Sequence, residues 1–401
     1  MTSQAAARQV RHHPERSATT SWWHEASGSV ADLGVLIPIA IALIVSNGLS
    51  TTAVLLPAGA LYLVVAWTYR APVAVQPLKA FGAVAIAVGA GTDVIAAGSL
   101  LMGLVFLVLG ATGLLDRLGA TFPRSVIRGV QLAVGLTFAR IAWGLVVGPP
   151  STFTNQWSVA ATALVCVLVT IALLQWRRSS ALVAVLVGLA LAAGATWLAG
   201  DATIALGPTP VELPSISMAD LVLAATVLVL PQVPLTLTNS CLAPADAARR
   251  YFPDQATRIT PSRLARTLGG ANIVVAAIGG MPVCHGAGGM SAHHAFGART
   301  WRAPVLIGAA LVAVAVLLGQ DLAMILRSFP LAILAALLLV AGVTHVRLLS
   351  DVRGALDWSI ALGVGALGAS GHLLPAVLGG LAAALIAAAV HRRSTSRQPA
   401  R

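Results

Sequence analysis

The chain has 401 residues, of which 58% are apolar and 9% are charged, and its formal net charge is +12. Soluble domains carry about 25% charged residues, so this composition excludes a soluble protein. Apolar runs of about 17 to 25 residues, the length that crosses a bilayer, repeat from residue 28 to residue 390 and leave no room for a second, soluble domain. We therefore expect an all-α integral membrane protein.

The predicted elements are about fourteen membrane spans between two polar ends. An arm over residues 1–24 has no apolar centre and therefore differs from a cleaved signal peptide. A short tail covers residues 392–401. The spans are expected near residues 29–47, 50–69, 72–91, 93–114, 122–147, 156–176, 180–199, 218–240, 264–280, 282–298, 303–319, 325–346, 355–370 and 373–391.

Arginines mark the connections that follow even-numbered spans, whereas the connections after odd-numbered spans contain no lysine or arginine. Cytoplasmic loops of membrane proteins carry such an excess of basic residues, so we place both termini and all even-numbered connections in the cytoplasm. The positive charge is a topology signal and excludes a nucleic-acid partner. Three cysteines, Cys166, Cys241 and Cys284, are too few and too scattered for a disulfide framework.

The third span begins with an extended segment. Pro72 and Pro77 stand five residues apart, and proline both lacks an amide hydrogen and disfavours helix in the residue before it. Residues 71–76 are therefore expected to run extended and to climb ~17 to 20 Å, about half of the bilayer core. A helix over residues 78–91 completes the crossing. This span is expected to be half extended and half helical.

The tenth span repeats this plan from the opposite face of the membrane. Residues 279–285 carry Pro282 and two glycines and are expected to be extended, and a helix over residues 286–298 follows. Seven spans separate the two breaks, so the chain divides into two seven-span halves of opposite orientation. Interrupted spans at matching positions in two halves are a pointer to a transporter's binding site. The matching first and eighth spans carry interior polar residues and prolines: Ser29, Asp32, Gly34, Pro38, Pro231, Gln232, Pro234, Thr236, Thr238 and Asn239.

The two half-helices are expected to present their N-termini to one polar cavity at the membrane midplane. Helix N-termini have unpaired amide donors and a partial positive charge, so they favour anions. Lys79, the only lysine, stands in the first turn of one half-helix. Its alternative role is a structural ion pair with Asp32, which could also couple transport to protons or cations. The candidate substrate-binding residues are Gln76, Lys79, Ala80, Thr238, Asn239, His285, Gly286, Ala287, Gly288 and Gly289.

Several of these residues have a second interpretation. The glycines could serve close helix packing. Cys284 and His285 are weak metal ligands because no third partner stands near them in sequence, so a hydrogen-bonding or proton-carrying His285 is the better hypothesis. His293 and His294 are expected to be solvated. Arg140 and Arg327 could pair with Asp321 or lipid headgroups and receive no transport role. We expect no metal and no cofactor. We also expect no enzymatic activity, because Cys284 and His285 are adjacent on extended backbone and point to opposite sides, so they could not easily act together as nucleophile and base.

Four sequence stretches resemble the molybdate transporter family of plants, algae and bacteria. They are VQPLKA at 75–80, PLTLTNS at 234–240, GGMPVCHGAGGM at 279–290 and FGART at 296–300. The family is a branch of the sulfate permease and nucleobase transporter architecture. The resemblance implies two inverted seven-span repeats, with a transport core over about 29–114 and 218–319 and a gate domain over about 122–199 and 325–391. The family's usual Gly-Asp-Leu-Gly is Ala31-Asp32-Leu33-Gly34 here.

The resulting functional expectation is secondary import of an oxyanion, molybdate first and sulfate as the alternative, by alternating access in the cell membrane. A dianion entering against 100 mV costs about 4.6 kcal/mol, so proton symport through Asp32 or His285 is expected. The resemblance leaves a homodimer open. A nucleobase permease is the weaker alternative because residues 221–240 and 281–298 contain no carboxylate. An anion channel is a further alternative, which concentrative uptake would exclude.

Overall fold

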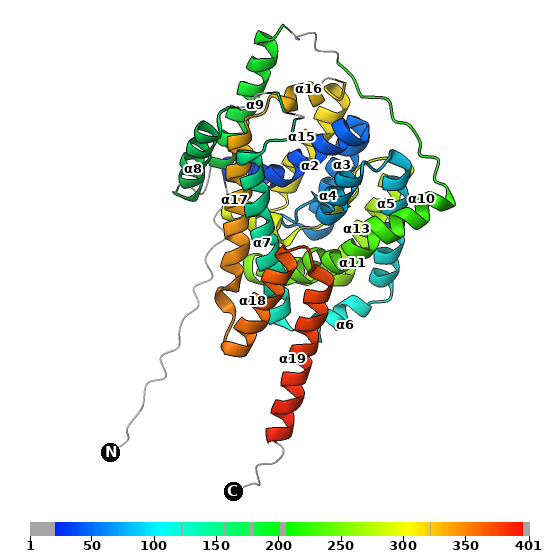
Figure 1. The fold of residues 1–401 in the computed structure, drawn as a ribbon, viewed down its shortest axis with the longest axis vertical. Helices are drawn as coiled ribbons and strands as arrows, with labels where there is room; N and C mark the ends of the chain where they lie inside the picture. The colour runs from blue at the N-terminus through cyan, green and yellow to red at the C-terminus, as the bar shows by residue number, and fades with distance from the viewer. Residues whose placement is uncertain are drawn as a thin grey trace.

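A computed structural model describes residues 21–121, 123–151, 153–154, 157–175, 180–200, 206–320 and 322–395, and most of these residues are helical (Figure 1). Within them, four helices are long and apolar enough to cross a membrane: Thr51–Tyr69, Thr92–Ala111, Arg124–Val147 and Leu331–Asp351. Shorter apolar helices accompany them, including Val159–Gln175, Arg302–Leu317 and Ala355–Ala369. This pattern indicates a multi-pass membrane protein.

Most of the predicted spans coincide with helices whose ends lie within a few residues of the expected ones. The helix Thr51–Tyr69, for example, ends at Arg70, which adopts a positive φ of 54° directly after the second predicted span. The matching helices are α3 (Thr51–Tyr69), α5 (Thr92–Ala111), α7 (Arg124–Val147), α8 (Val159–Gln175), α9 (Ser180–Leu198), α13 (Pro261–Ala277), α15 (Arg302–Leu317), α18 (Ala355–Ala369) and α19 (Leu373–Thr395).

The first predicted span differs from the expectation. Helix α1 (Trp22–Ser29) begins inside the segment expected to be an arm, a 3-10 turn η1 (Val30–Asp32) interrupts the helix, and α2 (Leu33–Asn47) completes it. The Ser21 side chain accepts a hydrogen bond from the amide of Trp23 and caps α1. The helix therefore starts earlier than the span predicted from residue 29, because a cap that sequence periodicity does not reveal begins it at Trp22.

The eighth and twelfth spans are also more complex than predicted. The eighth is one long helical stretch in which two π-helical segments, η2 (Ala224–Val229) and η3 (Leu237–Leu242), separate α10 (Met218–Leu223), α11 (Leu230–Thr236) and α12 (Ala243–Tyr251). Pro231 and Pro234 lie in α11, and proline removes helical hydrogen bonds. The twelfth divides into α16 (Leu322–Arg327) and α17 (Leu331–Arg347), because Pro330 caps the second helix. Short helices α6 (Leu114–Thr121), η4 (Pro253–Arg258) and η5 (Leu348–Asp351) fill connections.

The predicted change from extended chain to helix is confirmed at both places. Strand β1 (Gln76–Pro77) leads into helix α4 (Lys79–Val88), and strand β2 (Val283–Cys284) leads into helix α14 (Ala287–Ala295). The two strands pair antiparallel, with Gln76 opposite Cys284 and Pro77 opposite Val283. The amide of Leu78 also donates to the carbonyl of Pro282 at 3.0 Å. The backbone groups of the two extended segments therefore partly satisfy each other inside the protein.

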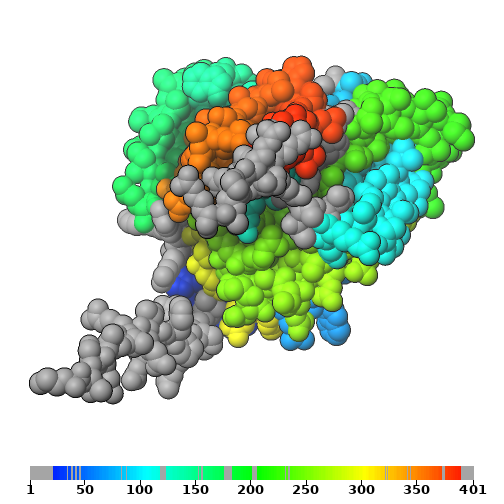
Figure 2. All heavy atoms as spheres, turned by 90° about the horizontal axis from the view of Figure 1, so that it is seen from below, coloured from blue at the N-terminus to red at the C-terminus, as the bar shows by residue number. Residues whose placement is uncertain are grey.

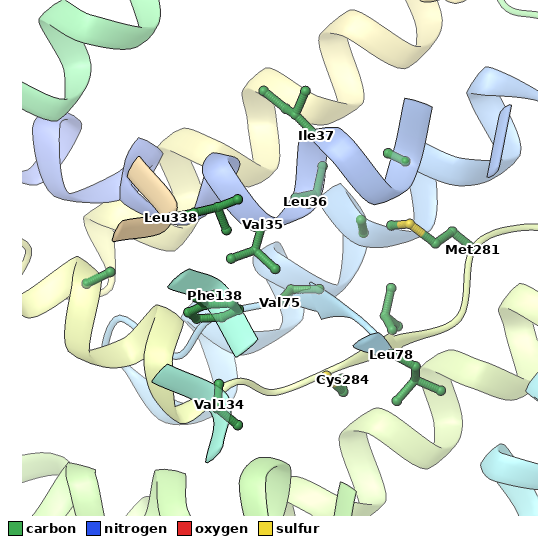
Figure 3. Close-up of a cluster of buried hydrophobic side chains, with 14 of the residues drawn as sticks. Val35, Leu36, Ile37, Val75, Leu78, Val134, Phe138, Met281, Cys284 and Leu338 are labelled. Carbon is green, nitrogen blue, oxygen red and sulfur yellow. The ribbon is translucent and has the colours of Figure 1, made fainter. Parts of the chain in front are cut away.

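The paired strands lie in the apolar interior of the protein. Figure 3 shows side chains of α2 (Val35, Leu36, Ile37) and of α7 (Val134, Phe138) gathered around the two extended segments, which Val75, Leu78, Met281 and Cys284 mark. All of these side chains are buried. Packing of this kind holds non-helical backbone away from lipid, as a membrane protein requires.

Connections of the same parity lie together. On the side of the odd-numbered connections, the amide of Thr209 donates to Thr52 Oγ1 at 2.8 Å and the amide of Ser215 donates to Asp93 Oδ1 at 2.9 Å. On the side of the even-numbered connections, the amide of Ser262 donates to Asp116 Oδ1 at 2.8 Å. The predicted alternation of the two faces is consistent with these contacts.

The helices divide into two groups in space. Helices α7, α8, α9, α17 and α18 gather on one side of Figure 1, and α3, α4, α5 and α13 gather on the other. Seen from below, the green to lime atoms of the stretch from α10 to α13 adjoin the cyan atoms of α5 and α6 (Figure 2). The paired strands bring segments from both halves of the sequence to the junction of these groups.

Candidate functional site

The N-termini of the two half-helices meet at the strand pair. Helix α4 starts at Lys79 and α14 at Ala287, each directly after its strand. The first amides of a helix have no intrahelical carbonyl to bond, and the amides of Ala287, Gly288 and Gly289 have no hydrogen-bond partner among the described residues. The two termini therefore place free donors and partial positive charge in one buried place.

Lys79 begins a chain of polar contacts. Its Nζ donates to Gln76 Oε1 at 2.5 Å, and Gln76 Nε2 donates to Asp32 Oδ1. Tyr62 donates from its hydroxyl to Asp32 Oδ2 at 3.4 Å. All four side chains are buried, and Lys79 is the most accessible at 8%. Lys79 and Asp32 are therefore linked through Gln76, and among the described ion pairs there is none between them directly.

The first turn of α4 is partly capped by another helix. The amide of Phe81 donates to Gln232 Oε1 at 2.8 Å, and Gln232 Nε2 donates to Thr236 Oγ1 at 2.9 Å. Gln232 stands in α11, between the two π-helical segments. This contact leaves the amides of Lys79 and Ala80 as the donors of that terminus, as the sequence prediction for Ala80 requires.

Three glycines at the start of α14 allow close approach of polar side chains. A Cβ atom at Gly286 would overlap the amide of Gln76, and one at Gly288 would overlap the imidazole of His345. A Cβ atom at Gly289 would lie 2.7 Å from Asp32 Oδ1. Gly288 thus packs against α17, to which His345 belongs, whereas Gly286 and Gly289 face Gln76 and Asp32, with Ala74 also beside Gly289, so helix packing accounts for only part of the glycine cluster.

His285 has a protein partner at each of its ring nitrogens. One ring nitrogen lies 2.8 Å from Thr267 Oγ1 and the other 3.2 Å from the carbonyl of Ala74. Tyr69 packs against the ring edge at 6.0 Å and its hydroxyl shares Thr267 at 2.7 Å. Both nitrogens are thus already bonded to protein groups, and for that reason we leave His285 out of the binding set proposed below.

Thr238 and Asn239 lie in the π-helical segment η3 and are buried. Thr238 Oγ1 donates to the carbonyl of Leu235 at 3.3 Å. The amide oxygen of Asn239 has no hydrogen-bond partner among the described residues. Both residues stand on η3, a different element from the half-helix starts at Lys79 and Ala287.

The remaining sequence candidates have structural or peripheral places. His293, expected to be solvated, is buried and its Nδ1 lies 2.7 Å from the carbonyl of Gly28. Arg140 is exposed, and the carbonyl of Arg327 accepts from Thr154 at 3.0 Å. Asp321, the predicted ion-pair partner, lies outside the described residues. No cluster of three or more metal-ligating side chains occurs in the described parts of the chain.

Sequence reasoning missed an ion-pair network between helices. Arg128 of α7 contacts Asp246 of α12 at 2.5 Å through Nη1 and Asp351 of η5 at 2.5 Å through Nη2. Arg250 lies 3.9 Å from Asp351. The sequence alone assigns no role to Arg128, Asp246 or Asp351, and only the fold shows that they meet.

A cavity of about 680 Å³ opens beside this network. Ile127 and Leu242 line it, and both belong to a small apolar cluster with Ala243 and Ala287, the first residue of α14. A thin apolar layer therefore separates the cavity from the half-helix terminus. The other lining residues are Asp116, Arg124, Ala245, Asp246, Arg249, Ala256, Thr257, Ile259, Thr260 and Pro261.

The arrangement suits an anion. Free amides, two helix N-termini and one lysine supply donors and positive charge in a water-poor place, where such interactions are strong. The buried carboxylate of Asp32 is occupied by Gln76 and Tyr62. A second missed residue, His345, adds unpartnered ring nitrogens at the same place.

Comparison with known proteins gives a consistent family. The model of a family described as a molybdate transporter of the MFS superfamily matches residues 24–138 and 224–344, more than half of the chain. Molybdate transporter 1 of Chlamydomonas reinhardtii is 30% identical, and the match covers 85% of this chain and 86% of that protein. Molybdate transporter 1 of Arabidopsis thaliana is 31% identical over 82% of this chain and 83% of that protein.

Solved structures share the fold at lower identity. The transmembrane domain of a cyanobacterium bicarbonate transporter, BicA, gives a TM-score of 0.54 at 19% identity and covers 88% of this chain and 97% of that chain. Murine Solute Carrier 26 family member A9, an anion transporter in the inward-facing state, gives a TM-score of 0.61 at 13% identity. The match covers 97% of this chain and 74% of that chain. These likenesses show a membrane-transporter fold.

Proposed function

This chain belongs to the molybdate transporter family, and from that premise we propose that it imports molybdate as a secondary transporter. The anion would lie between the N-termini of α4 and α14. The observation that carries this proposal is the meeting of two half-helix N-termini with a single buried lysine. Relatives that carry the name molybdate transporter support molybdate as the substrate.

In the proposed site, Lys79 supplies the positive charge and the amides of Ala80, Ala287, Gly288 and Gly289 donate hydrogen bonds to the oxygens. The role of Gln76 is to hold Lys79, because its amide oxygen accepts the 2.5 Å hydrogen bond from Nζ. An arriving dianion would take over as the acceptor for Nζ. The exchange is favoured because the dianion adds the attraction of opposite charges, which the neutral amide of Gln76 does not supply.

We further propose that two inverted seven-span repeats form the fold. In such a repeat each span corresponds to the span seven places later in the chain. Span two therefore corresponds to span nine and span four to span eleven, so the contact between spans two and eleven should match the contact between spans nine and four. Both crossings use facing glycines: a Cβ at Gly59 of α3 would lie 2.8 Å from the carbonyl of Gly308 in α15, and one at Gly103 of α5 would lie 3.0 Å from that of Gly269 in α13. Spans five and twelve correspond to each other, so they should cross each other at a contact that the symmetry leaves unchanged. They cross at Gly135 and Gly342, where a Cβ atom at Gly135 would lie 3.0 Å from the carbonyl oxygen of Gly342.

The symmetric crossings support the division into a transport core and a gate domain. The core would hold spans one to four and eight to eleven, and the gate would hold spans five to seven and twelve to fourteen. The 680 Å³ cavity lies where α12 of the core meets α7 of the gate. We propose that this cavity is the cytoplasmic path to the anion site. Ile127 and Leu242 form the apolar layer that separates the cavity from the site. Movement of core against gate would open that layer.

The energy of import requires a coupled ion. A dianion that enters a cell interior at −100 mV costs about 4.6 kcal/mol, so a passive carrier would exclude molybdate. We propose proton symport with Asp32 as the carrier, since its carboxylate is buried and touches the anion site through Gln76. We also propose that both termini lie in the cytoplasm, and the arginine-rich even-numbered connections support this orientation.

Uptake into vesicles that contain the purified protein tests this function. Labelled molybdate should accumulate when an inward proton gradient is imposed, and unlabelled molybdate should compete best among molybdate, tungstate, sulfate, selenate and uracil. Stronger competition by sulfate would make sulfate the substrate. Competition by uracil alone would overturn the anion site.

A further inference from the structure

His345 is a buried histidine that the site described so far does not use. It stands in the last turn of α17 and is fully buried. Neither of its ring nitrogens has a hydrogen-bond partner among the described residues. Buried polar atoms nearly always have a partner, because an unpaired one has lost its water without replacement. By contrast, both ring nitrogens of His285 are bonded.

The His345 ring lies against the start of α14. A Cβ atom at Gly288 would overlap its Nε2, so only glycine leaves room for the ring at this position. Gly288 is the second residue of α14, and its amide is one of the free donors of that helix terminus. An unpartnered ring nitrogen and unpartnered backbone donors therefore converge on the same small volume.

The opposite gate helix presents a ring in the corresponding place. Helices α7 and α17 cross at Gly135 and Gly342, and Phe138 and His345 each stand three residues after these glycines. The two rings contact edge to face at 5.6 Å. Lys79 Nζ lies 5.4 Å from the Phe138 ring centroid. Each gate helix thus offers one aromatic ring to one half-helix terminus, and only His345 carries polar atoms.

We propose that His345 is a substrate-contacting residue that donates a hydrogen bond from Nε2–H to an oxygen of the oxyanion held at the Gly288 amide. The inference rests on the proposed anion site. A tetrahedral oxyanion has four oxygens that all accept hydrogen bonds, and an additional donor matches it. The imidazole must carry its hydrogen on Nε2, because an acceptor nitrogen would repel the anion.

This contact links binding to the movement of the two domains. Every other proposed ligand belongs to β1, α4 or α14, which lie in the proposed core, whereas His345 belongs to the proposed gate. The oxyanion would bridge core and gate only while the start of α14 lies against α17. His345 would then favour one position of the loaded core.

Calorimetric titration of the purified full-length protein with molybdate tests the inference. The variant His345→Phe fills a similar volume without a donor, and His345→Gln keeps an amide donor on a flexible stem. We expect His345→Phe to bind molybdate about tenfold or more weakly, as loss of a hydrogen bond to a charged group predicts. His345→Gln should recover most of the affinity, and the melting temperature of ligand-free His345→Phe should stay near that of the unmodified protein.

A Lys79→Ala variant distinguishes a failure of the proposed anion site from a failure of the proposed role of His345. If Lys79→Ala loses binding while His345→Phe binds like the unmodified protein, His345 is a packing residue and the anion site remains. If both His345 variants bind equally weakly and both melt early without ligand, its role is structural and the inference is wrong. If the unmodified protein does not bind molybdate, the proposed function fails and this inference fails with it.

Discussion

Lys79 Nζ donates a 2.5 Å hydrogen bond to Gln76 Oε1, and Gln76 joins this lysine to Asp32. The buried cation is thus held by a neutral amide instead of a carboxylate. A neutral partner leaves most of the positive charge available to a ligand. This relationship explains why glutamine, rather than an acid, is the first residue of β1.

Replacement of Gln76 by glutamate should weaken molybdate binding more than replacement by alanine does. Gln76→Glu places a second carboxylate beside Asp32 and next to the proposed anion, and like charges there repel. We expect Gln76→Glu to abolish molybdate binding and Gln76→Ala to weaken it by about 1.5–3 kcal/mol, or roughly 10- to 150-fold. Calorimetric titration measures both. Tighter binding by Gln76→Glu than by Gln76→Ala would contradict the proposed role of the amide.

Replacement of Asp32 by asparagine should separate binding from coupling. Asparagine keeps an oxygen that accepts from Gln76 or Tyr62 but cannot carry a proton at neutral pH. We expect molybdate affinity to stay within about tenfold, and we expect uptake to lose its acceleration by an inward proton gradient. Uptake into vesicles at fixed voltage, with and without the gradient, gives the answer. Unchanged acceleration in Asp32→Asn would remove Asp32 as the proton carrier.

Addition of a methyl group at the start of α14 should block the site. In Gly288→Ala the new Cβ overlaps His345, whereas Gly270→Ala in α13 meets open space and serves as the matched control. Overpacking of this kind costs about 1–3 kcal/mol, so Gly288→Ala should melt earlier and take up little molybdate. Gly270→Ala should behave like the unmodified protein. Equal uptake by the two variants would show that the cradle around Gly288 is looser than the structure indicates.

Loss of Arg128 should destabilise the fold strongly. Its side chain is 3% exposed and serves two carboxylates, Asp246 and Asp351. Removal of one partner from a buried ion pair costs about 3–5 kcal/mol, so we expect Arg128→Gln to melt well below the unmodified protein. Arg250→Gln is the control, because Arg250 is 42% exposed and lies 3.9 Å from Asp351. Thermal unfolding in detergent compares the two variants, which should differ clearly.

The local breaks of the chain could be predicted from sequence because they depend on proline and glycine chemistry. Pro72 and Pro77 in one span and Pro282 in another forced extended backbone, and the strands β1 and β2 lie where this was expected. Gly286 to Gly289 likewise stand at the start of the predicted half-helix.

Other features depended on tertiary contacts that no local pattern contains. His285 looked available in sequence, yet Thr267 and Ala74 use both of its ring nitrogens. His345 looked like one polar residue in an apolar helix, and only the approach of α14 gives it a role. The π-helical segments around α11 also follow from packing, since the sequence shows two prolines but not how the helix accommodates them.

The central claim is that Lys79 provides the charge of a molybdate site between two half-helices. Titration of purified Lys79→Ala with molybdate tests it most directly, with Arg140→Ala as a control that removes one exposed positive charge elsewhere. We predict that Lys79→Ala binds at least about tenfold more weakly or not at all, while Arg140→Ala binds like the unmodified protein. Molybdate affinity that is the same in Lys79→Ala, Arg140→Ala and the unmodified protein would contradict the account.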